Sequence, residues 1–279
     1  MTTPRAPYLL IAPAALVFVT LFVASTVYFF IISFWTVRLF RAVPDFTLLN
    51  YAKAFSVHWG SAVRTIGIAL AIALLATSLG FLYGWLIRFK VGRWGPALLF
   101  IALITLFGGY LMKIYAWKTL LGGDGVINSA LVHLGLVDRP IEALLYSPFA
   151  VILTLTHFLM PFAILPIYAA LRGITDAEIE SARDLGARPG RIFLDVIVPR
   201  TRTGLIAGFA LCFLICVGDY VTPRLVGGTM AMFGQMIQTQ YGTAANWPLG
   251  SAMSFSILAV GLLILWVLAR ALGLVGRQP

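Results

Sequence analysis

Long, uninterrupted runs of apolar residues dominate the hydrophobic pattern of this chain. A helix needs about 20 mostly apolar residues to cross the hydrocarbon core of a bilayer. Runs such as Leu9–Val23 and Ser256–Ala269 are continuous, whereas the strands of a membrane barrel alternate apolar and polar positions. The pattern predicts six transmembrane helices, at Tyr8–Trp35, Val63–Ile87, Pro96–Leu121, Pro148–Leu171, Gly204–Thr222 and Ser251–Leu272.

The composition indicates an integral membrane protein of the all-α class. Of the 279 residues, 61% are hydrophobic and 11% are charged, and the mean hydropathy is +0.96. A soluble domain averages roughly 45–50% apolar and about 25% charged residues. It could not bury so much apolar surface at this length. The first apolar run is longer than that of a signal peptide, so we expect an uncleaved first helix.

The distribution of basic residues predicts the orientation in the membrane. An even number of spans places both termini on one side. With both termini in the cytoplasm, the inner segments hold twice as many Lys and Arg as the outer loops, as the positive-inside rule requires. We therefore interpret the net charge of +10 as a topology signal rather than as a nucleic-acid-binding surface. We expect residues 1–60 to form the first helix and an outer loop, and residues 61–272 a domain of five helices.

The cytoplasmic loop at residues 172–203 differs most from the rest of the chain. It carries six Arg and five acidic residues, and this mixture of signs favours docking onto another protein over adhesion to anionic lipid. Local signals predict a helix capped by Asp176 and ending at Gly186, then a second short helix, Arg191–Val198, that ends at Pro199. A solvated connector is the alternative.

A motif within this loop resembles the "EAA" loop of the membrane subunits of type I ATP-binding-cassette (ABC) importers. That pattern is Glu-Ala-Ala, three residues, Gly, nine residues, then Ile-x-Leu-Pro, and the spacing is the same from Glu180 to Pro199. In the family this loop forms the coupling helix that sits in a groove of the ATPase subunit. The resemblance implies that ATPase coupling involves Glu180, Ser181, Ala182, Gly186, Ala187 and Pro199.

Further stretches are similar to spermidine/putrescine permeases, and the similarity covers nearly the whole chain. They include Tyr115–Trp117, Gly123–Ser129, Leu159–Tyr168, Gly218–Pro223 and Asn246–Pro248. The resemblance implies a permease of the bacterial inner membrane that works with two ATPase subunits, a second related permease and an extracytoplasmic solute-binding protein. Relatives that share these motifs also carry opines or aminophosphonates, so these solutes remain alternatives to polyamines.

The residues give no indication of catalysis in this chain. No Gly-Lys pair occurs, so a Walker A phosphate loop is absent from the sequence. The three histidines are scattered without metal-ligand spacing, so we expect no metal and no cofactor. By the resemblance, ATP and Mg²⁺ are used by the partner ATPase. Two alternative functions have less support. An ion-coupled secondary transporter would need buried acids near the membrane midplane, and the sequence offers one acid near the end of a span. A membrane enzyme would need a cluster of polar catalytic residues, and we find none in the sequence.

One acidic residue falls inside a predicted span, and charges there are costly. Asp219 lies near the outer end of the fifth span and could attract an ammonium group along the substrate path. Aromatic faces also bind ammonium groups, and the candidates are Tyr220, Tyr110, Tyr115 and Trp117. The alternatives are that Asp219 pairs with Arg224 at a helix end and that the aromatic residues form an interfacial belt.

Overall fold

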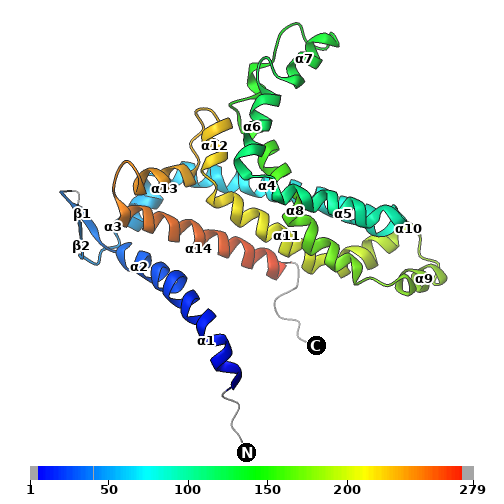
Figure 1. The fold of residues 1–279 in the computed structure, drawn as a ribbon, viewed down its shortest axis with the longest axis horizontal. Helices are drawn as coiled ribbons and strands as arrows, with labels where there is room; N and C mark the ends of the chain where they lie inside the picture. Colours follow the sequence, from blue (N-terminus) through cyan, green and yellow to red (C-terminus); the bar gives the residue numbers. More distant parts are fainter. Residues whose placement is uncertain (1–5, 40, 272–279) are drawn as a thin grey trace, which may run out of the picture. The chain divides into compact units, whose positions relative to one another are not determined.

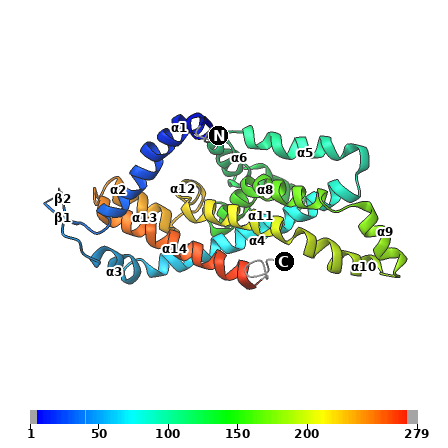
Figure 2. The ribbon, with the colours of Figure 1, turned by 90° about the horizontal axis from the view of Figure 1, so that it is seen from below.

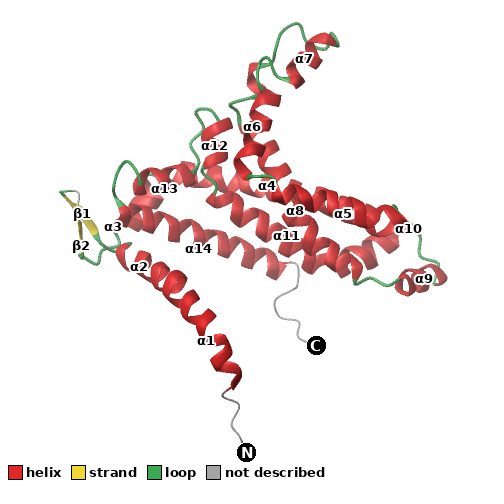
Figure 3. Ribbon diagram, in the orientation of Figure 1, coloured by secondary structure: helices red, strands yellow, loops and turns green. Residues whose placement is uncertain are grey.

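The structure is a computed structural model, and it describes residues 6–39 and 41–271. Apart from one short antiparallel hairpin, its regular elements are helices (Figure 3). The hairpin pairs Thr36 with Val43. Its strands are β1 (Thr36–Arg38) and β2 (Arg41–Val43). The longest helices, α4 (Trp59–Phe89), α8 (Pro148–Arg172), α11 (Val198–Gly218) and α14 (Trp247–Ala271), are the predicted spans.

The remaining elements are shorter. The first span consists of α1 (Ala6–Phe18), the π-helical η1 (Val19–Val23) and α2 (Ala24–Ile32). Helices elsewhere are α3 (Leu49–Ser56), α5 (Gly95–Ile104), α6 (Tyr110–Leu121), α7 (Val126–His133), α9 (Asp176–Asp184), α10 (Pro189–Arg191), α12 (Val221–Val226) and α13 (Phe233–Tyr241). Short 3₁₀ segments are η2 (Gly92–Trp94), η3 (Thr105–Phe107) and η4 (Glu142–Leu144), and η5 (Ile192–Ile197) is π-helical.

The described residues form two compact units, drawn from residues 1–60 with 236–259 and from residues 61–235 with 260–279. In the first unit, Phe29 of α2 stacks on Trp247, with ring centroids 6.2 Å apart. Asn50 of α3 donates to the backbone carbonyls of Ser33 and Trp35, at 2.9 and 2.7 Å, and so satisfies carbonyls that the end of α2 leaves free.

Close packing of α8 against its neighbours forms the core of the second unit. Helices α8 and α11 run side by side (Figures 1 and 2). A Cβ atom on Gly204 would lie 2.5 Å from the carbonyl oxygen of Pro166, and one on Gly208 would lie 3.1 Å from that of Ala163. Small residues four apart let transmembrane helices approach this closely. The α8–α11 contact therefore depends on the absence of side chains at Gly204 and Gly208.

The described residues include five helices that are long and apolar enough to cross a membrane, or six if one bent pair counts as a single span. The first, second, fourth and last predicted spans correspond to Ile11–Ile32, α4, α8 and α14. The predicted end of the last span, Leu272, lies outside the described residues. The residue boundary near 60 between the two expected domains stays a prediction, and so does the cytoplasmic location of both termini.

The predicted third span, Pro96–Leu121, is not one continuous helix. The pair Gly92–Phe107 and Tyr110–His133 is bent by 98°. The chain leaves the helix at Gly108 and Gly109, where ψ is 121° and 138°. Each glycine in a helix costs about 1 kcal/mol relative to alanine, so two adjacent glycines are a weak point at which the chain bends.

The prediction that a helix ends at Pro199 is also wrong, and the fifth span is present but has other ends than the predicted Gly204–Thr222. One candidate span extends from Pro189 to Gly218 and includes Pro199. Proline removes a backbone donor and its ring crowds the preceding turn. The π-helical turn η5, directly before α11, widens the helix at this point. The span therefore begins within the charged loop at residues 172–203 and continues through the proline.

Candidate functional site: a helix in the charged loop and a buried aspartate

Helix α9 lies in the charged loop, and the two residues predicted to cap it and to end it, Asp176 and Gly186, lie near its two ends. Thr175, not Asp176, is the N-cap residue, because its hydroxyl accepts from the N–H of Glu178 while Glu178 accepts from the N–H of Thr175. This reciprocal pair is a capping box. Asp176 instead lies in the first turn, where an acidic side chain also suits the helix dipole.

Gly186 ends α9, as the sequence predicts. Its φ is +78°, a left-handed conformation that glycine adopts without steric cost. The N–H of Gly186 donates to the carbonyl of Arg183 at 2.8 Å, and the N–H of Ala187 donates to that of Ala182 at 3.0 Å. These two bonds form a Schellman motif. The glycine of the predicted motif therefore has a structural role at the end of this helix.

Two arginines connect α9 to the long helices. Arg88, in the last turn of α4, donates to the carbonyl of Ile174 at 3.0 Å and to Asp176 at 2.8 Å. Arg200, in the first turn of α11, donates to Glu178 at 2.6 Å. The Thr175 N–H, with smaller contributions from the Arg200 guanidinium, holds the pKa of Glu178 below its ordinary value. Helix α9 is thus held at its first turn by both spans.

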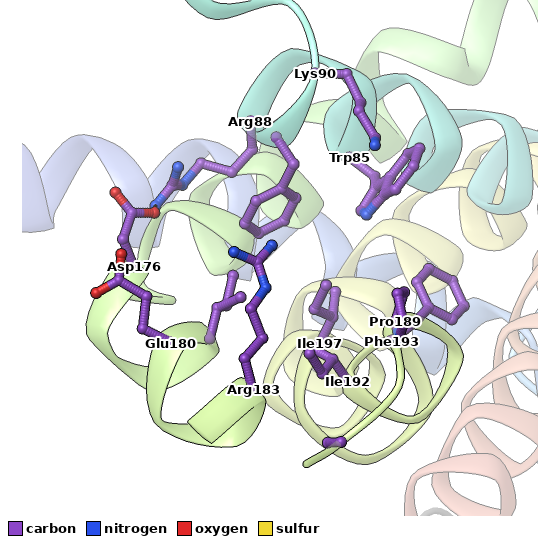
Figure 4. A pocket seen from close by; sticks show the side chains of 13 residues that line it. Trp85, Arg88, Lys90, Asp176, Glu180, Arg183, Pro189, Ile192, Phe193 and Ile197 are labelled. Carbon is purple, nitrogen blue, oxygen red and sulfur yellow. Dashed lines mark hydrogen bonds and ion pairs between the residues drawn. The ribbon is translucent and has the colours of Figure 1, made fainter. Parts of the chain in front are cut away.

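A cavity of about 500 Å³ lies between α9, η5 and the end of α4 (Figure 4). Glu180 and Ala187, two of the predicted coupling residues, line it. Ser181, Gly186 and Pro199 are exposed to solvent, and Ala182 is partly buried in the second turn of α9. Sequence reasoning missed several lining side chains of α4, α9 and η5, among them Trp85, Arg88, Arg183 and Phe193. Arg183 lies inside the charged loop and could have been suggested by that position, whereas Arg88 comes from the end of α4.

A buried polar cluster surrounds Asp219 at the opposite end of α11. One carboxylate oxygen, Oδ1, accepts from the Tyr110 hydroxyl at 2.6 Å and from the N–H groups of Val221 and Thr222 at 3.0 and 3.4 Å. The Thr222 hydroxyl lies 2.7 Å from that of Tyr110. The aspartate is 9% exposed. Among the described ion pairs none involves Asp219, so the alternative that it pairs with Arg224 is wrong.

A cavity of about 260 Å³ adjoins this cluster, and the structure brings only some of the predicted path residues to it. Asp219, Tyr220 and Tyr110 line the cavity, together with Leu155, Phe158, Ile215, Gly218 and Val221. Tyr115 and Trp117 are not among its lining residues. Trp117 instead donates to Nδ1 of His157 at 3.2 Å, and Tyr115 is exposed.

Sequence reasoning missed Phe158 and Thr222. Thr222 had a local signal, because Asp219 lies three positions before the Thr222-Pro223 pair, and an acidic residue and a proline near each other in this way are typical of a helix start. Phe158 had none, since it comes from α8 and meets Tyr110 only in the fold.

Comparison with known proteins identifies the family. Residues 89–274 match the family described as "Binding-protein-dependent transport system inner membrane component". The spermidine/putrescine transport system permease protein PotB of Haemophilus influenzae is 34% identical over 245 residues, which cover 86% of this chain and 84% of that protein. The inner membrane ABC transporter permease protein YdcU of Escherichia coli is 30% identical over 80% of this chain and 75% of its own length.

The fold is also that of a solved transporter. The crystal structure of a bacterial ABC transporter involved in import of the acidic polysaccharide alginate contains a chain with a TM-score of 0.73 and 16% identity. The match covers 98% of this chain and 96% of that one. The chain therefore belongs to the family of binding-protein-dependent inner membrane transport components and is the permease subunit of a type I ABC importer. It is a multi-pass protein of the inner membrane.

Proposed function

We propose that this permease forms the path by which spermidine or putrescine enters the cell, together with two ATPase subunits, a second related permease and a solute-binding protein. The observation that carries the substrate class is the 34% identity to PotB over 86% of the chain. The dependence on a binding protein follows from the family. ATP and Mg²⁺ would be used by the ATPase subunits, and no cofactor is required in this chain.

The cytoplasmic helix α9 would couple ATP use to transport. Its surface residues Ser181 and Gly186 are exposed, and Leu185 between them is 88% exposed. An apolar side chain this exposed at the tip of a charged loop is suited to contact another protein. Because α9 is tied to α4 by Arg88 and to α11 by Arg200, movement of an attached ATPase would move both spans.

The Asp219 cluster supports a cationic substrate. Three donors stabilise the charge of the carboxylate through Oδ1, and its second oxygen has no hydrogen-bond partner. Tyr220 is 42% exposed, and the rings of Tyr110 and Phe158 line the same cavity. Carboxylates and aromatic faces are the groups that replace the water around an ammonium ion. A polyamine, with several ammonium groups, matches this chemistry.

The test is ATP hydrolysis by the reconstituted complex with its binding protein, while spermidine, putrescine, an opine and 2-aminoethylphosphonate are titrated separately. We expect saturable stimulation by the two polyamines and none by the other solutes. Stimulation by the opine or the phosphonate alone would contradict the substrate and keep the importer class. Failure to isolate any ATPase subunit with the permease would contradict the coupling mechanism.

A further inference from the structure

Two opposite charges near the Asp219 cavity lack hydrogen-bond partners. They are the second carboxylate oxygen of Asp219, Oδ2, and the ammonium group of Lys113 on α6, and both atoms are buried. Among the described residues, neither group takes part in an ion pair. A buried charge without a partner costs several kcal/mol, so each unpaired group requires an explanation. The simplest is that each finds its partner in another state of the protein.

A pair of aromatic rings lies between the two charges, with Lys113 over one ring and Asp219 bonded to the hydroxyl of the other. The Lys113 ammonium is 5.2 Å from the ring centroid of Phe158, and the Tyr110 ring is 4.7 Å from that of Phe158. The Tyr110 hydroxyl in turn donates to Asp219. Residues three apart lie on the same face of a helix, so Lys113 lies on the same face of α6 as Tyr110, which lines the cavity. The lysine is thus one helical turn away from the residue that holds the aspartate.

The break before α6 provides a way for the lysine to move. Helix α6 follows the 98° bend at Gly108 and Gly109, where glycine allows wide changes in backbone dihedral angles. The Lys113 side chain folds back toward this bend, since a Cβ atom on Gly108 would lie 3.4 Å from Lys113 Cε. A rotation of α6 about the glycines, or a rotamer change of the lysine, would bring the ammonium toward Asp219.

We propose that Lys113 is a tethered competitor for the substrate ammonium at Asp219. Without substrate, the lysine pairs with the free carboxylate oxygen in the closed state of the path. The position over Phe158 in this structure is the unpaired alternative, to which the substrate would shift the lysine by taking its place at Asp219. A tethered group acts at an effective concentration in the millimolar range or above. Lys113 would therefore exclude monovalent amines and admit solutes that bring several ammonium groups. The solute class in this inference rests on the proposed function, whereas the charge pair does not.

The first test is a zero-length cross-link in the assembled permease–ATPase complex without its binding protein. A membrane-permeant carbodiimide joins an amine to a carboxylate only when the two are in contact, and mass spectrometry of the digested protein detects the Lys113–Asp219 amide. We expect this amide in the substrate-free complex and a loss of about tenfold with saturating spermidine, within the usual range of coupling between sites. Absence of the amide in the substrate-free complex would overturn the proposal.

The yield of the Lys113–Asp219 amide also distinguishes failure of the polyamine assignment from failure of the charge exchange at Asp219. An amide that survives spermidine but is lost with 2-aminoethylphosphonate keeps the exchange at Asp219 and contradicts the polyamine assignment. An amide that survives both solutes contradicts the exchange itself.

The second test is equilibrium binding of radiolabelled spermidine to the same complex. Removal of the competitor in Lys113→Met should tighten binding about tenfold, whereas Lys113→Arg should bind as the wild type does. In an Asp219→Asn background, which weakens binding by itself, Lys113→Met should produce no further change. Lys118→Met is the matched control, because that ammonium lies over the ring of Tyr146, at 5.7 Å, and not over Phe158. Weaker or unchanged binding in Lys113→Met would overturn the proposal.

Discussion

The two ends of α11 carry charges that are arranged in opposite ways. Arg200, in the first turn, forms a 2.6 Å pair with Glu178 in a region exposed to water. Asp219, directly after the last turn, is buried and keeps one oxygen without a partner. Fully paired charges fix the position of a neighbouring element, whereas a buried charge with a free oxygen retains its capacity to bind. The α9 end of α11 is therefore suited to transmit movement, and the other end to meet a solute.

The comparison of the two ends requires that α11 connects them rigidly. Among the variants considered, Gly204→Leu should have the largest effect, because it disrupts the packing of α11 on α8. The new side chain would collide with the backbone of α8, because even a Cβ atom would lie 2.5 Å from the Pro166 carbonyl oxygen. Overpacking of this kind costs about 1–3 kcal/mol or more. We expect loss of the assembled complex, measured as the yield of permease that co-purifies with the ATPase.

Gly218→Leu is the matched control for this prediction. It lies near the other end of α11, and a Cβ atom there would have no neighbour within 4 Å. Wild-type yield of the Gly204→Leu complex would show that α8 and α11 do not pack as closely as described.

Arg88→Gln tests the α9 end of α11 and should have a smaller effect, on the coupling of ATP hydrolysis to transport. The change removes the pair with Asp176 and weakens the bond to the Ile174 carbonyl, so α9 is held by α11 alone. Exposed pairs contribute about 0–1 kcal/mol, so we expect ATP hydrolysed per solute transported to rise by about two- to fivefold. Arg93→Gln, whose guanidinium lies over Trp94, is the control. An equal rise in both variants would contradict a specific role of Arg88.

The smallest expected effect is a pH dependence at the cap of α9. The pKa of Glu178 is lowered in the folded state, so its stabilising contribution is present above the unfolded pKa of about 4.3 and is lost as the pH falls through the folded value. Amide hydrogen exchange of α9, corrected for the intrinsic pH effect, should show weaker protection near pH 3 than at pH 7. The same change of protection in Glu178→Gln would contradict this origin.

The α9 end of α11 could largely be predicted from sequence because local rules determine it. Gly186 ends α9 as expected, since a left-handed residue after a helix strongly favours glycine. The errors there were local as well. Thr175 outcompeted Asp176 as the N-cap because Glu178 completes a capping box with it. The helix continued through Pro199 because the π-helical turn before it compensates for the proline.

The region around Asp219 could be predicted only in part because contacts between distant segments determine it. The cost of an intramembrane charge was sufficient to select Asp219. Its partner Tyr110 comes from 109 positions away in the sequence, and Phe158 comes from α8. The bend at Gly108 and Gly109 turns α6 away from the line of α5, so the spacing of Tyr115 and Trp117 along a straight span gave no guide to the cavity.

The central claim is that α9 couples ATP hydrolysis to transport. Its most direct test is the number of spermidine molecules taken up per ATP hydrolysed by the complex in proteoliposomes, with the binding protein present. Gly186→Asp places a charge on the proposed ATPase contact, where a Cβ atom has open space, although the φ of +78° is strained for any side chain and least so for aspartate or asparagine. We predict an assembled complex that still hydrolyses ATP while this ratio falls at least about tenfold, whereas Gly190→Asp, also in open space, keeps the wild-type ratio. A wild-type ratio in Gly186→Asp would contradict coupling through α9.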